Sequence, residues 1–156
     1  MASLQSIAHE VDFIKKLLLK EVPPEHFSMK DIVRSFFGAA FIGSTFIFSR
    51  LLIEIPPLLT TRHVIAIVVS TLAILTAEIY YIGYQRVENK KARPFGQFWL
   101  KRLLTFYAVS IIVSSYLALI YNVIHLVGGD NVAKLIVAMS LPCSIGASIT
   151  DLLKKY

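Results

Sequence analysis

Cysteine is almost missing from this sequence, and several other chemical signatures are missing with it. Cys143 is the single cysteine among 156 residues, which excludes an internal disulfide and a thiolate metal cluster. The sequence contains no HExxH motif, no phosphate-binding glycine loop and no serine elbow. Its histidines, His9, His26, His63 and His125, lie near opposite sides of the apolar segments and do not converge on a metal site. We therefore expect a protein that is not an enzyme and that holds no cofactor or metal.

Long apolar runs dominate what is present. The hydrophobic fraction is 56% and the mean hydropathy is +0.66, whereas soluble domains contain roughly 45–50% apolar residues. A helix needs roughly 20 apolar residues to cross a bilayer core about 30 Å thick. Four segments approach that length, approximately 33–55, 64–85, 103–127 and 132–152. The sequence therefore predicts an all-α polytopic membrane protein in which residues 28–156 form a domain of four transmembrane helices.

Residues 1–27 are expected to remain outside the bilayer core. Apolar residues recur there at steps of three and four, which is typical of an amphipathic helix on the membrane surface or against the bundle. A short intersubunit coiled coil is the alternative. Pro23 and Pro24 would end this helix. Ser28 and Asp31 then form a predicted capping box at the start of the first span, and the pair Pro56–Pro57 is expected to end that span.

The positions of the positive charges indicate the orientation. The net charge is +6. Nearly all Lys and Arg residues lie before the first span, in the connection after the second span, or at the C-terminus; the exceptions are Arg50, Arg62 and Lys134. Because positive residues are retained on the cytoplasmic side, both termini are expected in the cytoplasm, and the protein is expected in the cell membrane. This distribution explains the charge without a nucleic-acid partner. Phe95, Phe98 and Trp99 would anchor the inner interface.

Glu78 is an acid inside the second apolar segment. An ionised side chain at the centre of a span costs about 2.5–3.5 kcal/mol on insertion scales, so Glu78 should face the bundle interior, a water-filled cavity or a partner. Thr71 and Gln85 lie on the same helical face, and Tyr81 lies one turn away. The third and fourth segments carry comparable stripes, consisting of Tyr107, Ser110, Ser114, Tyr121 and His125, and of Ser140, Ser144, Ala147 and Asp151.

These stripes leave two interpretations of Glu78 open. In the first, Glu78 binds protons or monovalent cations in a channel or transporter, and the neighbouring oxygens come from Tyr81, Ser110, Ser114 and Ser144. Four helices enclose little space, so such a path would require a homo-oligomer. In the second, a hydrogen-bonded Glu78 joins helices within the bundle. The protein would then be a membrane scaffold whose N-terminal helix and basic connection bind a partner or anionic lipids.

Two residue pairs and two small residues complete the candidate features. Arg50 and Glu54 lie one turn apart near the outer end of the first span, where they would form an ion pair or an outer gate. Pro142 and Gly146 interrupt the fourth span and predict either an ordinary kink or a hinge. Ala39 and Gly43 predict close helix packing.

Two short patterns resemble those of uncharacterised prokaryotic integral-membrane proteins that are grouped as a domain of unknown function. The first pattern is an acid followed by two aromatic residues and a glycine, at Glu78–Ile79–Tyr80–Tyr81–Ile82–Gly83. The second is a late proline, Pro142, followed by the run Gly146–Ala147–Ser148. The resemblance implies residence in a membrane and no particular activity.

Overall fold

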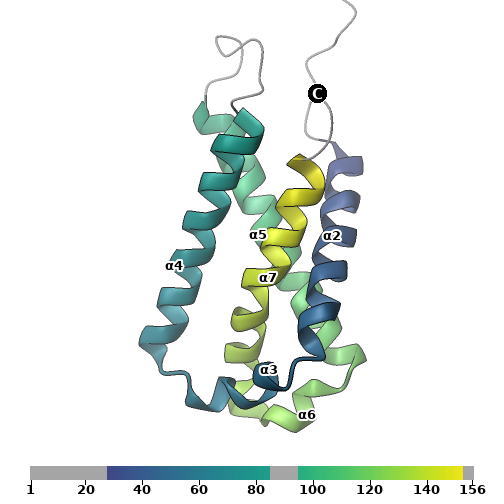
Figure 1. Ribbon diagram of the computed structural model, residues 1–156, viewed down its shortest axis with the longest axis vertical. Helices are drawn as coiled ribbons and strands as arrows, with labels where there is room; N and C mark the ends of the chain where they lie inside the picture. Colours follow the sequence, from purple (N-terminus) through teal and green to yellow (C-terminus); the bar gives the residue numbers. More distant parts are fainter. Residues whose placement is uncertain (1–27, 85–94, 153–156) are drawn as a thin grey trace, which may run out of the picture.

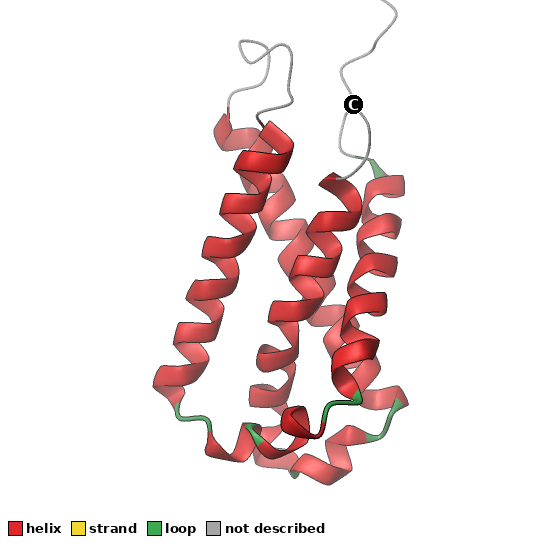
Figure 2. Ribbon diagram, viewed as in Figure 1, coloured by secondary structure: helices red, strands yellow, loops and turns green. Residues whose placement is uncertain are grey.

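The computed structural model describes residues 28–84 and 95–152, and in these two ranges the chain forms helices and no strands (Figure 2). The long helices are α2 (Met29–Ile47), α4 (Thr61–Glu78), α5 (Phe95–Ile120) and α7 (Val132–Leu152). The short ones are α3 (Arg50–Glu54), η1 (Pro56–Leu58), the π-helical turn η2 (Ile79–Gly83), α6 (Val123–Val127) and η4 (Gly129–Asn131). The predicted all-α fold is confirmed. The predictions for residues 1–27, for Gln85 and for the basic residues of 86–93 and 154–155 lie outside the described residues.

The long helices run alternately up and down, with α7 in contact with α2, α4 and α5 (Figure 1). The start of α2, the end of η2, the start of α5 and the end of α7 all lie at the upper end in Figure 1. The segments predicted to be cytoplasmic are therefore all attached to one end of the bundle. The lower end carries α3, η1, α6 and η4.

Three helices are long and apolar enough to cross a membrane, namely Thr61–Gly83, Phe95–Ile120 and Gly129–Asp151. A fourth span results if α2 is counted together with Leu52–Leu58, although the helix axis turns by 86° between these two parts. The described residues therefore provide three to four spans. The last helix, α7, has the bounds that its apolar run predicts.

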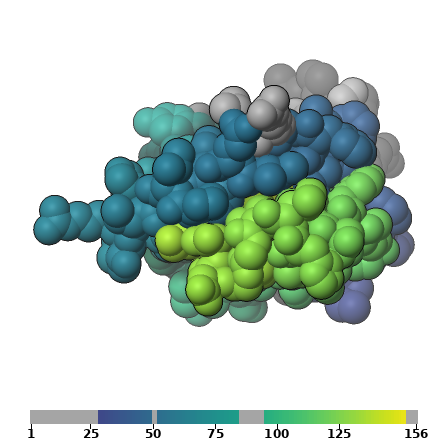
Figure 3. Space-filling model, turned by 90° about the horizontal axis from the view of Figure 1, so that it is seen from below, coloured from purple at the N-terminus to yellow at the C-terminus, as the bar shows by residue number. Residues whose placement is uncertain are grey.

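The first span is the clearest departure from the predicted boundaries, because the helix expected over 33–55 is not continuous. The backbone N–H of Ser49 donates to the Phe46 carbonyl at 2.9 Å, which closes the last turn of α2. The Ser49 carbonyl then accepts from Leu52 N–H at 3.0 Å as α3 begins. Serine is favoured immediately before a helix, so the chain changes direction before it reaches Pro56 and Pro57. Seen from below, α3 (blue) lies beside α6 (green) (Figure 3).

The third span is also displaced from its predicted bounds of 103–127. Helix α5 already begins at Phe95, and it ends at Ile120. Asn122 has φ 55°, a left-handed conformation that asparagine adopts more readily than most residues, and it separates α5 from α6. Consequently Phe98, Trp99 and Arg102 belong to the first turns of a transmembrane helix and not to a loop.

Local signals at the start of α2 work as the sequence predicts. The Asp31 carboxylate accepts a hydrogen bond from the Ser28 backbone N–H at 2.8 Å, and the reciprocal Ser28 contact is also present. This confirms the capping box, which satisfies backbone donors at the helix start. Below this cap, α2 packs against α7, and Gly38 of α2 lies directly against Gly146 of α7.

Candidate functional site

Glu78 is the last residue of α4, where the helix passes into the π-helical turn η2. Its side chain is partly buried, and its Oε2 accepts a hydrogen bond from Ser148 Oγ of α7. Counted along the span Thr61–Gly83, Glu78 lies about 9 Å from the centre, towards the upper end, at a rise of 1.5 Å per residue. The acid thus connects two helices inside the apolar part of the bundle.

The Ser148 hydroxyl has two hydrogen-bond partners for one proton. Besides Glu78, its Oγ lies 3.0 Å from the Ile145 carbonyl oxygen. When Glu78 is ionised, the hydroxyl donates to the carboxylate. When Glu78 is protonated, the acid can donate to Ser148 Oγ while the hydroxyl turns to the Ile145 carbonyl. Both protonation states of Glu78 are therefore hydrogen-bonded by the same pair of residues.

The turn that follows Glu78 was not expected from the sequence. In η2 the Tyr84 N–H is shared between the carbonyls of Ile79 and Tyr80, an arrangement in which the turn is wider than that of an α-helix. Such π-helical turns occur frequently at functional sites. The wider turn rotates the residues after Glu78 away from regular helical spacing.

Tyr81 is placed accordingly. It is 65% exposed, and its ring contacts Tyr80 edge-on at 5.2 Å between centroids. The structure does not bring the Tyr81 hydroxyl to Glu78. Tyr81 would lie one turn from Glu78 in a regular α-helix, whereas the chain forms a π-helical turn there.

The three serines predicted around Glu78 lie inside the bundle. Ser110 and Ser144 donate to the carbonyls of Tyr107 and Leu141, one turn back in their own helices, at 2.7 and 2.8 Å. Ser114 is fully buried beside Cys143. These hydroxyls line the interior along α5 and α7, but none of them is joined to Glu78 by a hydrogen bond within the described residues. Ser148, which was not among the predicted site residues, makes that contact.

The remaining predicted pairs lie elsewhere. Glu54 is exposed on α3 at the lower end, whereas the Arg50 side chain lies outside the described part of the chain, so their ion pair stays a prediction.

Helix α7 continues through Pro142 as an α-helix. A Cβ atom added to Gly146 would lie 2.4 Å from the Gly38 carbonyl oxygen. In this structure Gly146 therefore lies at a close crossing of α2 and α7.

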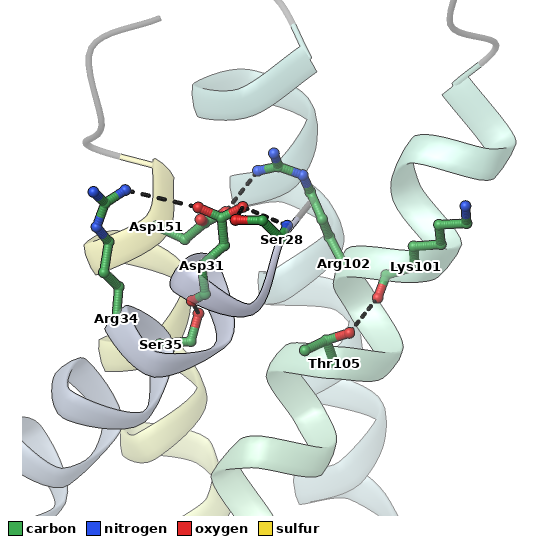
Figure 4. Close-up of polar contacts among 8 residues, drawn as sticks. All are labelled: Ser28, Asp31, Arg34, Ser35, Lys101, Arg102, Thr105 and Asp151. Atoms are coloured by element: carbon green, nitrogen blue, oxygen red, sulfur yellow. Dashed lines mark hydrogen bonds and ion pairs between the residues drawn. The ribbon is translucent and has the colours of Figure 1, made fainter. Parts of the chain in front are cut away.

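A charge cluster at the upper end, with three buried members and the exposed Arg34, was missed by the sequence reasoning (Figure 4). Arg102 Nη1 of α5 lies 2.7 Å from Asp151 Oδ2 of α7, and the two residues are 4% and 0% exposed. The Arg102 guanidinium also covers the Phe98 ring, 4.4 Å from its centroid. Asp31 of α2 is likewise buried, and its Oδ1 lies 3.7 Å from Arg34 Nη1. We call Asp31, Arg34, Arg102 and Asp151 the upper charge cluster.

The sequence contained a signal for this cluster. Phe98, Arg102 and Phe106 follow one another at steps of four and lie on one face of α5. The apolar run of the third segment begins at Leu103, so hydropathy alone assigns Arg102 to the preceding connection. Continuing the helical phase backwards would have placed Arg102 on the buried face, opposite the polar stripe that ends in Asp151.

Aromatic residues join α4 and η2 to the first turns of α5. Trp99 Nε1–H donates to Thr76 Oγ1 at 3.0 Å, and rings from both elements contact one another, including Tyr80 with Phe95 and Tyr84 with Phe98. The residues predicted as an interfacial anchor therefore lie together at the upper end of the bundle.

Replacement of Trp99 by phenylalanine tests this connection. We expect Trp99→Phe to lower the free energy of unfolding by about 0.5–1.5 kcal/mol, because one partly buried hydrogen bond is lost while most of the ring remains. Reversible unfolding in mixed micelles measures the change. Tyr116→Phe, which alters a half-exposed side chain, is the control. Equal stabilities of both variants and the wild type would show that the bond contributes nothing.

The segment Thr61–Gly83, formed by α4 and η2, is the least buried of the three unbroken spans. Only 17% of its apolar window is buried, against 44% for α5 and 50% for the segment that contains α7. The buried residues are Thr71 and Leu75 of α4 and Ile79 and Gly83 of η2, which recur at steps of four. Ile65 and Val69, by contrast, are 58% and 59% exposed. Most of α4 thus remains available to lipid or to a second protein chain.

Comparison with known families supports these observations. The family described as "Putative integral membrane protein (DUF2391)" matches residues 15–153. The chain belongs to this family. The match covers all described helices and agrees with the resemblance noted at Glu78–Gly83 and at Pro142 with Gly146–Ser148. No curated protein and no solved structure matches the chain. The chain is therefore an integral membrane protein with several apolar helices, of a family whose function is unknown.

Proposed function

We propose that this protein is a small channel or transporter for protons or monovalent cations, with Glu78 as its intramembrane binding carboxylate. It acts as a homo-oligomer in the cell membrane, surrounded by lipid, with both termini in the cytoplasm. It is not an enzyme. The observation that carries the proposal is the contact between Glu78 and Ser148 inside the bundle.

This contact suits a group that gains and loses a proton or cation. A carboxylate in an apolar span is costly unless it is paired, solvated or neutralised. The Ser148 hydroxyl reduces that cost in either state of Glu78, because it can donate to the ionised form and accept from the protonated form. A glutamate that only joined helices would need a hydrogen-bond partner for a single protonation state, not for both. The adjoining π-helical turn provides local irregularity of the kind found at functional sites.

The oligomer is supported by the exposure of α4. One face of this helix packs on α7, and the outer faces of the same helix carry small and apolar residues such as Ala66, Val69 and Ala73. Small residues allow close approach of helices within a membrane. Packing of α4 against a second copy would place Glu78 near an interface between subunits, where a path of sufficient width can form.

Ion and proton flux into liposomes tests the proposal. We expect Glu78→Gln to abolish the flux that the wild type shows, because glutamine keeps the size and hydrogen bonding of the side chain but cannot carry a charge or exchange a proton. Asp130→Asn, which changes an exposed acid in the lower turn, is the control and should keep wild-type flux. Correct assembly of each variant is checked by size-exclusion chromatography.

An absence of flux for the wild type with every common cation would overturn the proposal. The alternative function, a non-transporting membrane scaffold, would then be favoured. In that case Glu78→Gln should leave binding of a partner or of anionic lipid vesicles unchanged. Charge reversal of Lys90, Lys91 and Arg93, or deletion of residues 1–20, should abolish that binding.

A further inference from the structure

We infer that the transported species is a proton, not an alkali cation, and that Asp151 is the second carboxylate that carries it, between Glu78 and the upper end of the bundle. This inference rests on the proposed function and specifies its substrate. It is drawn from the arrangement of Glu78, Ser148, Asp151 and Arg102.

The first step is the connection from Glu78 into α7. Ser148 Oγ is fully buried and contacts Glu78 Oε2 directly. Asp151 follows Ser148 by three residues on the same helix and is also fully buried. Residues three apart on a helix are neighbours, with about 5–6 Å between their Cβ atoms. Proton transfer requires one water to bridge the Ser148 hydroxyl and the Asp151 carboxylate, a separation that this helical spacing allows.

Proton transfer from Glu78 through Ser148 to Asp151 leaves the number of protons on Ser148 unchanged. Protonated Glu78 donates its proton to Ser148 Oγ while the hydroxyl proton of Ser148 moves on, through water, to the Asp151 carboxylate. Glu78 is left ionised, Asp151 is left protonated, and Ser148 regains its original form after its hydroxyl rotates back. Asp151 then releases the proton to water at the upper end. The reverse sequence serves transport in the other direction.

The second step concerns the groups that face Asp151. Arg102 of α5 lies 2.7 Å from its Oδ2, Asp31 and Arg34 of α2 complete the upper charge cluster (Figure 4), and Glu78 of α4 is reached through Ser148. An arginine guanidinium remains protonated at any physiological pH. It balances the charge of buried Asp151 while that residue awaits a proton.

The same guanidinium disfavours a metal cation on this route. A sodium or potassium ion that left Glu78 for the upper end would have to pass beside Arg102, and like charges within a few ångströms repel strongly where water is scarce. A proton avoids this encounter because it moves by exchange along hydrogen bonds and is never a separate ion beside Arg102. The inner half of the path therefore suits protons.

Proton flux into liposomes that contain a pH-sensitive dye tests the inference. The assay is run with sodium or potassium on both sides and again with N-methylglucamine as the sole cation. We expect the wild type to conduct equally in all three media. Asp151→Asn should lower the flux about tenfold or more, since a positioned proton-transferring side chain contributes roughly 10²–10⁴-fold. Asp151→Glu, which keeps a carboxylate, should restore most of it.

A second variant covers the case in which Asp151→Asn does not fold, because that change leaves Arg102 buried without its carboxylate. The double variant Asp151→Asn/Arg102→Gln removes both charges and should assemble, yet remain as inactive as the single variant. Infrared spectroscopy should still detect titration of the Glu78 carboxyl group in this double variant, although the flux is lost. If Asp151 had only a structural role, its replacement would disturb the titration of Glu78 together with the flux.

Two results would overturn the inference while leaving the proposed function intact. The first is wild-type flux that disappears in N-methylglucamine but persists in sodium or potassium, since a metal cation would then be the species carried. The second is wild-type proton flux in an assembled Asp151→Asn or double variant. Loss of flux in Glu78→Gln in the same experiments shows that the proposed function still holds.

Discussion

Alanine at Gly38 is expected to force α2 and α7 apart. A Cβ atom at this position would lie 2.3 Å from the Gly146 carbonyl oxygen and 1.8 Å from Thr150 Oγ1. Rotation of Thr150 can move its hydroxyl but not its Cβ, which would lie 2.7 Å away, so the clash with α7 is relieved only if the helices separate. Overpacking of this kind typically costs about 1–3 kcal/mol, and we expect Gly38→Ala to reach the upper end of that range.

Other glycines in the chain provide matched comparisons for unfolding in mixed micelles. Gly146→Ala meets the Gly38 backbone from the other side and should be as destabilising as Gly38→Ala. Gly43→Ala meets only side-chain atoms, Cys143 Sγ at 2.6 Å and Leu117 Cδ1 at 2.8 Å, which can shift, so its effect should be smaller. Gly96 has no atom within 4 Å of an added Cβ, and Gly96→Ala should leave stability unchanged or raise it. Equal effects at all four positions would contradict the proposed close crossing.

Replacement of Arg102 by alanine is expected to be the most destabilising change at the upper end. It leaves the Asp151 carboxylate fully buried without the guanidinium that lies 2.7 Å away. Breaking a buried ion pair by removing one partner costs about 3–5 kcal/mol, because an uncompensated charge remains. The contact between the guanidinium and the Phe98 ring is lost as well. We expect a loss in this range at neutral pH.

The matched controls separate charge from packing. Lys101→Ala removes an exposed cation next in sequence and should have little effect. The double variant Asp151→Asn/Arg102→Gln removes both charges and should recover most of the stability that Arg102→Ala loses, since replacing both members of a buried pair is often close to neutral. If Arg102→Ala were no less stable than Lys101→Ala, the ion pair would not hold the upper ends of α5 and α7 together.

Local and periodic signals were interpreted correctly from the sequence. The uninterrupted apolar run of the fourth segment predicted α7 with its observed bounds, and the spacing of Ser28 and Asp31 predicted the capping box at the start of α2. Both features depend on residues within a few turns of one another. Glu78 was also expected to face other helices, because a carboxylate exposed to lipid is unfavourable, and it does contact α7.

Features that depend on competing local preferences were predicted less well. The first apolar segment continues past Ile47, so hydropathy alone indicated one helix, whereas the hydrogen bonds of Ser49 end α2 and begin α3. The π-helical turn after Glu78 has no recognisable sequence pattern, and it places Tyr81 on the exposed surface. In both cases the geometry of a single turn decides where the chain or a side chain is directed.

The sequence by itself determined that this chain is all-α and that it resides in a membrane, because these properties follow from the length, apolarity and periodicity of its segments. Its family was indicated by two short motifs and is shown by the match over residues 15–153. Only the tertiary structure decided which polar residues meet. Arg102 and Asp151 are 49 positions apart and Glu78 and Ser148 are 70 apart, so no local pattern specifies these pairs. They form because α7 packs between α2, α4 and α5, with Gly38 and Gly146 permitting the close approach. That packing places the buried charges side by side at one end of the bundle.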